Sequence, residues 1–399
     1  MSRSQQLLIA GGGIGAMAAA TAMARIGWDV RLFERAEAFG EVGAGLQLGP
    51  NVTHILHAWG LEQELAAVAA FPDHLQVRCA SSGAELGMLG LGTRTRSRYG
   101  APYATVHRAD LHALLWRAAS AHAQVHIRTG QTVLGFEDDG QVVRIRTDDQ
   151  LVEGDALLGA DGLLSAVRQQ LMGDGPPRMV GDLAYRSMLR ADGLPAHLRC
   201  NQVTAWLGPN LHVVQYPVRG GRAMNVVALI RGPAPADPHG WDHSANTALL
   251  HRALIGCCHP LRDLIASADE LSLNEHPWRM WVLADRPPVT AAHQMARGLV
   301  GLLGDAAHPM RPYMAQGAGM AVEDAFELAH ALGMTAIDLR TRLQRYALAR
   351  WQRVGRVQAR SERNGRIFHA RGLMRLGRNA SMRLLGERLL DVPWLYGSN

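Results

Sequence analysis

The sequence predicts an α/β protein with three parts: a parallel sheet flanked by helices, an inserted antiparallel-sheet domain and a C-terminal helical region. Three observations support this fold class. A short apolar strand near the N-terminus runs into a glycine turn and a helix. Similar strand-to-turn junctions follow at residues 159 and 304, and strand-like segments recur from 181 to 281.

The first junction begins with Leu7–Ile9, an apolar run too short for a helix and typical of a buried parallel strand. It continues as Gly11-x-Gly13-x-x-Ala16. Gly11 permits a tight turn, Gly13 lets a pyrophosphate approach the backbone, and Ala16 is small enough for the helix to lie on the sheet. A second strand ends at Glu34, whose carboxylate can bind ribose hydroxyls. This order predicts a dinucleotide site, but NAD and FAD both fit it.

Two later junctions carry an aspartate each. Asp161 follows an apolar strand, at the strand end where open α/β sheets bind ligands. Asp305 follows another, and a long helix then begins at Gln316–Gly319, whose peptide groups would point at a ligand. Arg108 lies near the start of an amphipathic helix, where it could bind an anion or form an exposed salt bridge.

These features predict four regions. Residues 1–180 would form the first part of the dinucleotide domain, 181–285 a substrate-binding sheet domain, 286–335 the second part, and 336–399 a helical region. Four arginines in the last region fall at helical spacing: Arg353, Arg356, Arg360 and Arg363. A solvated helix face is favoured over a surface that binds phosphate, lipid or an acidic partner.

The composition argues against several classes of protein. The net charge is +6, but every basic residue is arginine, which indicates genome composition rather than nucleic-acid binding. Four cysteines without a Cys-x-x-Cys pair predict neither a disulfide framework nor a metal site. No signal peptide and no apolar run of transmembrane length are recognised, so a cytoplasmic location without an integral membrane segment is expected.

The three motifs, in this order and spacing, resemble those of the class A flavoprotein aromatic hydroxylases, with the Rossmann-like FAD domain of the 4-hydroxybenzoate hydroxylase type. The resemblance implies that FAD is bound along its whole length and that NADH or NADPH is a transient reductant. The implied FAD-binding residues are Gly11, Gly13, Gly15, Ala16, Glu34, Arg35, Gln47, Arg108, Asp161, Gly304, Asp305, Pro309, Gln316, Gly317, Ala318 and Gly319.

Within that family, segment 43–51 and His212-x-x-x-Tyr216-Pro217 are most similar to the salicylate, 3-hydroxybenzoate and 6-hydroxynicotinate hydroxylases. The resemblance implies that His212 deprotonates a substrate phenol and that Tyr216 faces the substrate. Side chains four apart on a strand share a face, which is compatible with those roles. Some subfamilies place a Gln or a His at the position of Pro312 or Tyr313 and use it on the substrate, and Tyr313 could provide that hydrogen bond instead.

The implied reaction is hydroxylation of a small aromatic acid by NAD(P)H and O₂ through a C4a-hydroperoxyflavin. The expected partners are that substrate and O₂, with no nucleic acid, and the apolar C-terminus leaves a homodimer open. The alternatives are a same-fold hydroxylase of a quinone precursor, urate or a polyketide, an NAD dehydrogenase, or a non-enzymatic flavin-fold protein. A plain dehydrogenase does not explain Gly304-Asp305.

Overall fold

The computed structural model describes residues 4–40, 44–233, 243–244, 247–273 and 275–397. Residue 43, at the start of the 43–51 segment, lies outside the described residues. The chain divides into two compact units. The first comprises Met1–Glu41, Ala109–Arg178 and Ala284–Glu362, and the second comprises Val42–Arg108, Met179–Leu283 and Arg363–Asn399. Among the described residues, no helix combines the length and apolarity needed to span a bilayer.

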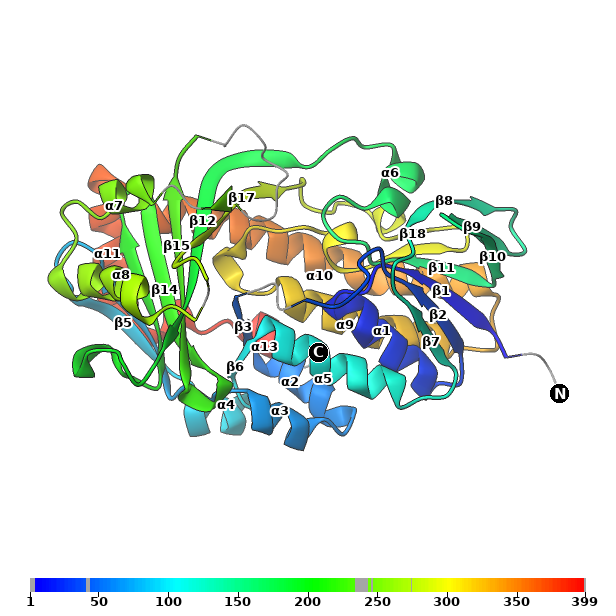
Figure 1. Ribbon diagram of the computed structural model, residues 1–399, viewed down its shortest axis with the longest axis horizontal. Helices are drawn as coiled ribbons and strands as arrows, with labels where there is room; N and C mark the ends of the chain where they lie inside the picture. The colour runs from blue at the N-terminus through cyan, green and yellow to red at the C-terminus, as the bar shows by residue number, and fades with distance from the viewer. Residues whose placement is uncertain (1–3, 41–43, 234–242, 245–246, 274, 398–399) are drawn as a thin grey trace. The chain divides into compact units, whose positions relative to one another are not determined.

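The first unit is built on a six-stranded sheet in the order β18-β19-β11-β1-β2-β7 (Figure 1). All strands except β18 run parallel. Their bounds are β1 Gln6–Ala10, β2 Asp29–Phe33, β7 Val125–Arg128, β11 Ala156–Gly159, β18 Ala296–Arg297 and β19 Val300–Leu302. A separate antiparallel sheet contains β8 Val133–Asp138, β9 Val143–Thr147 and β10 Leu151–Gly154. This confirms the α/β fold class predicted from the strand-to-turn junctions.

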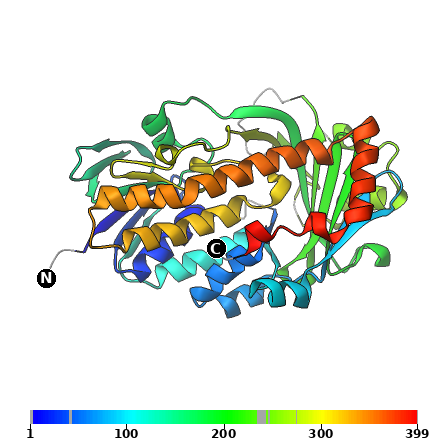
Figure 2. The same ribbon diagram turned by 180° about the vertical axis from the view of Figure 1, so that it is seen from behind.

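Helices pack on the parallel sheet because their apolar residues recur at helical spacing. The helices of this unit are α1 Ile14–Arg25, α5 Arg108–Ser120, α6 Ala166–Met172, α9 Gly317–Leu332 and the start of α10 Leu339–Phe368. Ten of the 12 residues of α1 are buried. Helix α10 buries Leu343, Tyr346, Ala347, Val354 and Val357. Figure 2 shows α9 and α10 side by side.

The second unit is built on an eight-stranded sheet in the order β16-β17-β12-β15-β14-β13-β4-β5. The bounds are β4 His74–Cys79, β5 Glu85–Gly90, β12 Arg178–Arg190, β13 Gln202–Gly208, β14 Leu211–Val218, β15 Ala223–Arg231, β16 His243–Ser244 and β17 Arg279–Asp285. Strands β3 Gly45–Leu48 and β6 Ala104–His107 form a two-stranded sheet. Residues 42–108 join this unit because β4 pairs with β13, a long-range pairing that the predicted boundary at 180 did not include.

One face of this sheet is covered by α7 Ala248–Ala253 and α8 His259–Leu271 (Figure 1). Alternate residues of β14, such as Leu211 and Val213, pack there against Leu261 and Leu264. The remaining helices of the unit are α2 Pro50–Ala58, α3 Glu62–Val68, α4 Gly92–Tyr99, α11 Gly372–Leu385, α12 Glu387–Leu390 and α13 Pro393–Tyr396. The opposite sheet face carries His212 and Tyr216, since these residues alternate with the α8-facing ones.

A buried ionic network joins α9 to α10 in the first unit. The Asp324 carboxylate accepts hydrogen bonds from Gly304 N (3.0 Å), His308 Nε2 (2.6 Å) and Arg350 Nε (2.7 Å). Arg350 also donates to Glu323 at 2.8 Å. Burial alone would raise the pKa of Asp324, but the charges and hydrogen bonds of His308 and Arg350 lower it to about 2. Asp324 therefore holds the turn at Gly304 in place on α9.

We predict that Arg350→Met destabilises the protein by about 3–5 kcal/mol, because it leaves the buried Asp324 carboxylate without its arginine and leaves Glu323 paired with Arg353 alone. The Asp324 pKa lies below its ordinary value of 3.8, so its stabilising effect is present above about pH 4 and is lost as the pH falls toward 2. Removing Arg350 should raise that pKa, and acid unfolding should begin at a higher pH. Urea unfolding at pH 7 and acid titration measure both effects. Arg345→Met, at an exposed position of α10, is the control, and equal stability of the two variants would contradict the prediction.

Candidate active site

The first unit presents an uncapped helix N-terminus at the glycine turn. Gly11 has φ +97°, a conformation that favours glycine, and a Cβ there would be 2.8 Å from the Cα of Asp161. Gly13 is the N-cap of α1, with no side-chain hydrogen bond to the helix amides, and a Cβ at Gly13 would meet nothing within 4 Å. A Cβ at Gly15, in contrast, would collide with Leu303. The turn therefore leaves donor amides and open space for an anion.

Glu34 lies immediately after β2 and is oriented by the same turn. Its Oε2 accepts from Gly12 N at 2.6 Å, and its Oε1 accepts from Ala36 N at 2.9 Å. His112 Nε2 lies 2.6 Å from Gly12 O and its ring contacts that of Phe39, with centroids 4.7 Å apart. His112 was not identified from the sequence, because its proximity to Gly12 is a contact between residues 100 apart.

Asp161 has a local structural role. Its carboxylate accepts from Ser165 Oγ at 2.5 Å and from the backbone amides of Ala166 and Val167, at 2.8 and 3.2 Å. Burial raises its pKa, and these hydrogen bonds oppose that shift. The carboxylate thus caps the start of α6, and its predicted contact with the cofactor stays a prediction.

The third motif places an acid beside a second helix start. Gly304 and Asp305 form a 3₁₀ turn, and Asp305 Oδ1 lies 3.9 Å from where a Cβ of Gly317 would be. Helix α9 begins at Gly317 after the buried N-cap Gln316, which makes no side-chain capping hydrogen bond. The preceding Ala315 has φ +51°, which turns the chain sharply into the helix. The arrangement combines helix-start amides with a carboxylate that can accept hydrogen bonds from hydroxyl groups.

In the second unit, Gln47 joins two phenols. Tyr103 donates to Gln47 Oε1 at 2.7 Å, and Tyr216 also hydrogen-bonds with Gln47. Burial raises the pKa of both tyrosines, so both stay protonated and can donate a hydrogen bond. Strand β3 packs directly on Tyr216, because a Cβ at Gly45 would be 2.5 Å from the Tyr216 ring. Gly45 N also donates to Asn225 Oδ1 at 2.7 Å.

His212 forms a pair that the sequence did not reveal. Its Nδ1 lies 3.0 Å from His369 Nε2, and Phe368 packs edge-on against its ring. Burial, followed by the nearby His369, lowers the pKa of His212 well below its ordinary value. Burial likewise lowers the pKa of His369 to about 4. Both imidazoles are therefore neutral at pH 7, and a neutral imidazole can accept a hydrogen bond or a proton.

The predicted site residues divide between the units. The first unit contains Gly11, Gly13, Gly15, Ala16, Glu34, Arg35, Asp161, Gly304, Asp305, Pro309, Tyr313, Gln316, Gly317, Ala318 and Gly319, and the second contains Gln47, Arg108, His212 and Tyr216. Tyr313 is 4% exposed, in a 3₁₀ turn before α9. Arg35 is exposed, and Arg108 begins α5. The carbonyl of Pro309 accepts from Gln358 at 3.0 Å.

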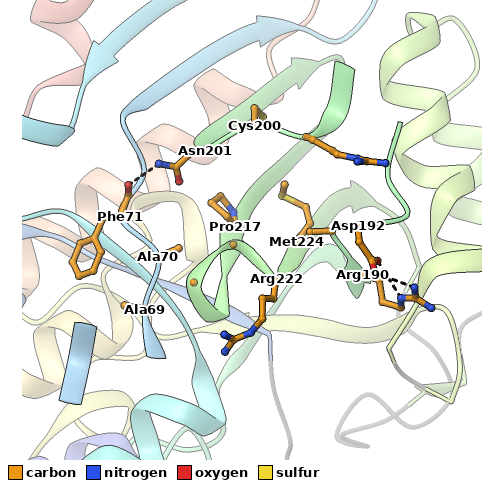
Figure 3. A pocket seen from close by; sticks show the side chains of 14 residues that line it. Ala69, Ala70, Phe71, Arg190, Asp192, Cys200, Asn201, Pro217, Arg222 and Met224 are labelled. Atoms are coloured by element: carbon orange, nitrogen blue, oxygen red, sulfur yellow. Dashed lines mark hydrogen bonds and ion pairs between the residues drawn. The ribbon is translucent and has the colours of Figure 1, made fainter. Parts of the chain in front are cut away.

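A cavity of the second unit lies elsewhere. It has a volume of about 860 Å³ and includes Ala69, Phe71, Arg190, Arg222 and Met224 in its lining (Figure 3). None of the predicted site residues lines it. Arg190 is paired with Asp192 at 3.1 Å, and Arg222 is exposed. A hydroxylation site must exclude water, so this exposed cavity fits that chemistry poorly.

Comparison with known proteins agrees with the glycine turn and both aspartate motifs. A family model described as "FAD binding domain" matches residues 4–185 and 273–361. The chain belongs to the FAD-dependent aromatic hydroxylases. It is 38% identical to the 3-hydroxybenzoate 6-hydroxylase of Polaromonas naphthalenivorans over 397 residues, covering 98% of this chain and 96% of that protein. It is 34% identical to the 6-hydroxynicotinate 3-monooxygenase of Bordetella bronchiseptica, covering 91% and 92%.

Solved structures share the fold of this hydroxylase. A Klebsiella pneumoniae protein complexed with FAD and uric acid has a TM-score of 0.84 and 24% identity, covering 98% of this chain and 96% of that one. A salicylate hydroxylase substrate complex has a TM-score of 0.82 and 23% identity, covering 100% and 97%. The predicted family, fold and FAD cofactor are therefore confirmed, as is the enzyme class, an aromatic-ring monooxygenase.

The residues present fit FAD. Open space at Gly13 and the uncapped start of α1 suit a diphosphate, and Glu34 suits a ribose. Asp305 beside the uncapped start of α9 suits the polyol chain and the electron-rich edge of a flavin. Bound FAD would supply activated oxygen for ring hydroxylation, and these residues would hold and orient it.

We predict that Gly13→Ala lowers FAD retention at least tenfold without unfolding the protein. The backbone at Gly13, φ −74° and ψ −176°, is allowed for alanine, and the new methyl group would meet no protein atom within 4 Å. It would occupy only the space that a diphosphate needs. Flavin absorbance per protein and the melting temperature of the apoprotein measure the two effects. Gly377→Ala, also in open space, is the control. Full flavin content in Gly13→Ala would contradict the assignment.

Proposed function

We propose that this hydroxylase acts on a small hydroxylated aromatic carboxylate, with 3-hydroxybenzoate as the first candidate. The observation that carries the proposal is that three relatives named 3-hydroxybenzoate 6-hydroxylase are 36–38% identical over almost the whole chain. Hydroxylation of that substrate at position 6 gives 2,5-dihydroxybenzoate. The ring C–H, O₂, NAD(P)H and a proton become C–OH, water and NAD(P)⁺.

His212 is the proposed proton acceptor. In the tautomer in which Nδ1 donates to His369, Nε2 is the acceptor for the substrate hydroxyl. Transfer of the phenolic proton to His212 makes the ring more electron-rich and thus more reactive toward activated oxygen. The lowered pKa keeps His212 neutral throughout the neutral range, and it also makes the imidazole a weaker base. Tyr216, on the same sheet face, is proposed to donate a hydrogen bond to a substrate oxygen.

The proposal also includes the reductant, the cellular location, one further substrate contact and the oligomeric state. NADH or NADPH is the expected reductant, and the cytoplasm is the expected location. Tyr313 is proposed as a further substrate contact, and the absence of nucleic-acid binding stays a prediction. A homodimer also stays open, and sedimentation of the purified protein would decide it.

The test is NAD(P)H oxidation by the purified FAD-loaded enzyme, with product identification, for 3-hydroxybenzoate, salicylate and 6-hydroxynicotinate. We expect 3-hydroxybenzoate to give 2,5-dihydroxybenzoate in an amount matching the NAD(P)H consumed. His212→Asn should lower the rate of product formation about 100-fold or more, because proton transfer is lost. It should leave flavin content unchanged.

His54→Asn is the matched control, because His54 is an exposed histidine on α2. This variant should match the wild type in rate and flavin content. Hydroxylation by His212→Asn at the wild-type rate would remove His212 from the mechanism. If none of the three acids is hydroxylated by the wild-type enzyme, the proposed substrate class is wrong.

A further inference from the structure

One row of side chains on the His212 face of the large sheet is more exposed than its neighbours. Strand register aligns Ala205 with Val214, Val214 with Val227, and Val227 with Arg186. Directly opposed residues of antiparallel strands point to the same face, so these four form a single row across β13, β14, β15 and β12. All four are half-buried.

The side-chain rows on either side of this one are buried. Their members are at most 4% exposed: Leu207, His212, Leu229 and Ala184 on one side, and Tyr216, Asn225 and Met188 on the other. The accessible row is therefore an apolar strip of Ala205, Val214 and Val227, flanked by the His212 row and the Tyr216 row, with a guanidinium at its β12 end. An aromatic ring that lay on this strip would have both polar side chains at its edges.

Arg186 carries an uncompensated charge at the end of the strip. Its guanidinium stacks on the indole of Trp281, 4.8 Å from the ring centroid, and its Nε is buried without a hydrogen-bond partner in the described part of the chain. The groups that act on its charge are Tyr216 and Arg108, and within the described ranges no carboxylate forms an ion pair with it. Burial lowers its pKa, which reflects the cost of holding a cation there.

Two buried arginines of this protein are neutralised by carboxylates, whereas Arg342 and Arg378 donate to backbone carbonyls and to amide oxygens. Arg168 pairs with Asp174 at 2.6 Å, and Arg350 pairs with both Glu323 and Asp324. A partly buried guanidinium that lacks such a partner favours an anionic ligand, and its planar donors match a carboxylate in a bidentate pair. Arg186 and Val214 lie two strands apart, about 10 Å between backbones. The long arginine side chain and one benzoate-sized acid can together cover that distance.

We propose that Arg186 binds the substrate carboxylate and selects aromatic acids over uncharged phenols, with the ring on Val214 and Val227. The proposal rests on the proposed function, since it assumes that the acid binds on the His212 face. It makes Arg186 a specificity-determining residue that the motifs did not identify. In this orientation the ring hydroxyl points toward the His212 or Tyr216 edge of the strip.

The test compares the binding of benzoate with that of benzamide, which has the same shape but no charge. Neither compound has a phenolic proton to donate. Calorimetric titration of the FAD-loaded enzyme measures binding without turnover. We expect the wild type to prefer benzoate, and Arg186→Met to weaken benzoate binding about 30–100-fold while changing benzamide binding little. Arg186→Lys, which keeps the charge but not the planar fork, should recover part of the loss.

Arg190→Met is the matched control, on the same strand but at the cavity of Figure 3, and it should leave the benzoate preference intact. Flavin content and melting temperature verify that each variant is folded. If Arg186→Met or Arg186→Lys keeps the full wild-type preference, or if the wild type shows none, the proposal is overturned. If Arg186 sets the preference but no hydroxylated acid is turned over, Arg186 retains its role and the proposed function fails.

Discussion

The turn that carries Asp305 depends on a carboxylate from another element, Asp324 of α9. Asp324 binds the backbone amide of Gly304, and it is itself held by His308 and Arg350. All of these side chains are at most 2% exposed, so none can exchange its partner for water without opening the core. The start of α9 and the turn proposed to bind the flavin are consequently fixed as one body, which would provide the preorganisation that electrostatic stabilisation of a flavin requires.

The face proposed to bind the substrate shows the same principle, with one charge left uncompensated among the described residues. Each polar side chain beside the accessible strip has a partner: His212 contacts His369, and Tyr216 hydrogen-bonds with Gln47. Arg186 is the exception among these, with only an aromatic stack and an apolar row beside it. A site that recognises a carboxylate needs such a cation, and its desolvation makes the pairing more selective than it would be at an exposed position.

Local motifs were predictable from the sequence because their physics is local. Gly11 and Gly13 act through backbone conformation and Glu34 through its carboxylate, all within one βαβ unit, and the structure shows that arrangement. The partner of His212 could not be predicted, because His369 is 157 residues away. Arg353 was interpreted as part of a solvated stripe, yet it pairs with Glu323 at 2.6 Å in a partly buried site. Arg186 has no sequence signature at all, since only strand register places it beside Val227.

The central claim is that an aromatic acid binds on the Val214–Val227 strip. The most direct measurement is a crystal of the FAD-loaded enzyme soaked with 3-bromobenzoate, in which bromine replaces the hydroxyl of 3-hydroxybenzoate. We expect an anomalous bromine peak over the strip, on the side of His212 or Tyr216, with the carboxylate on Arg186. A bromine peak only in the cavity lined by Arg190 and Arg222 (Figure 3) would contradict it.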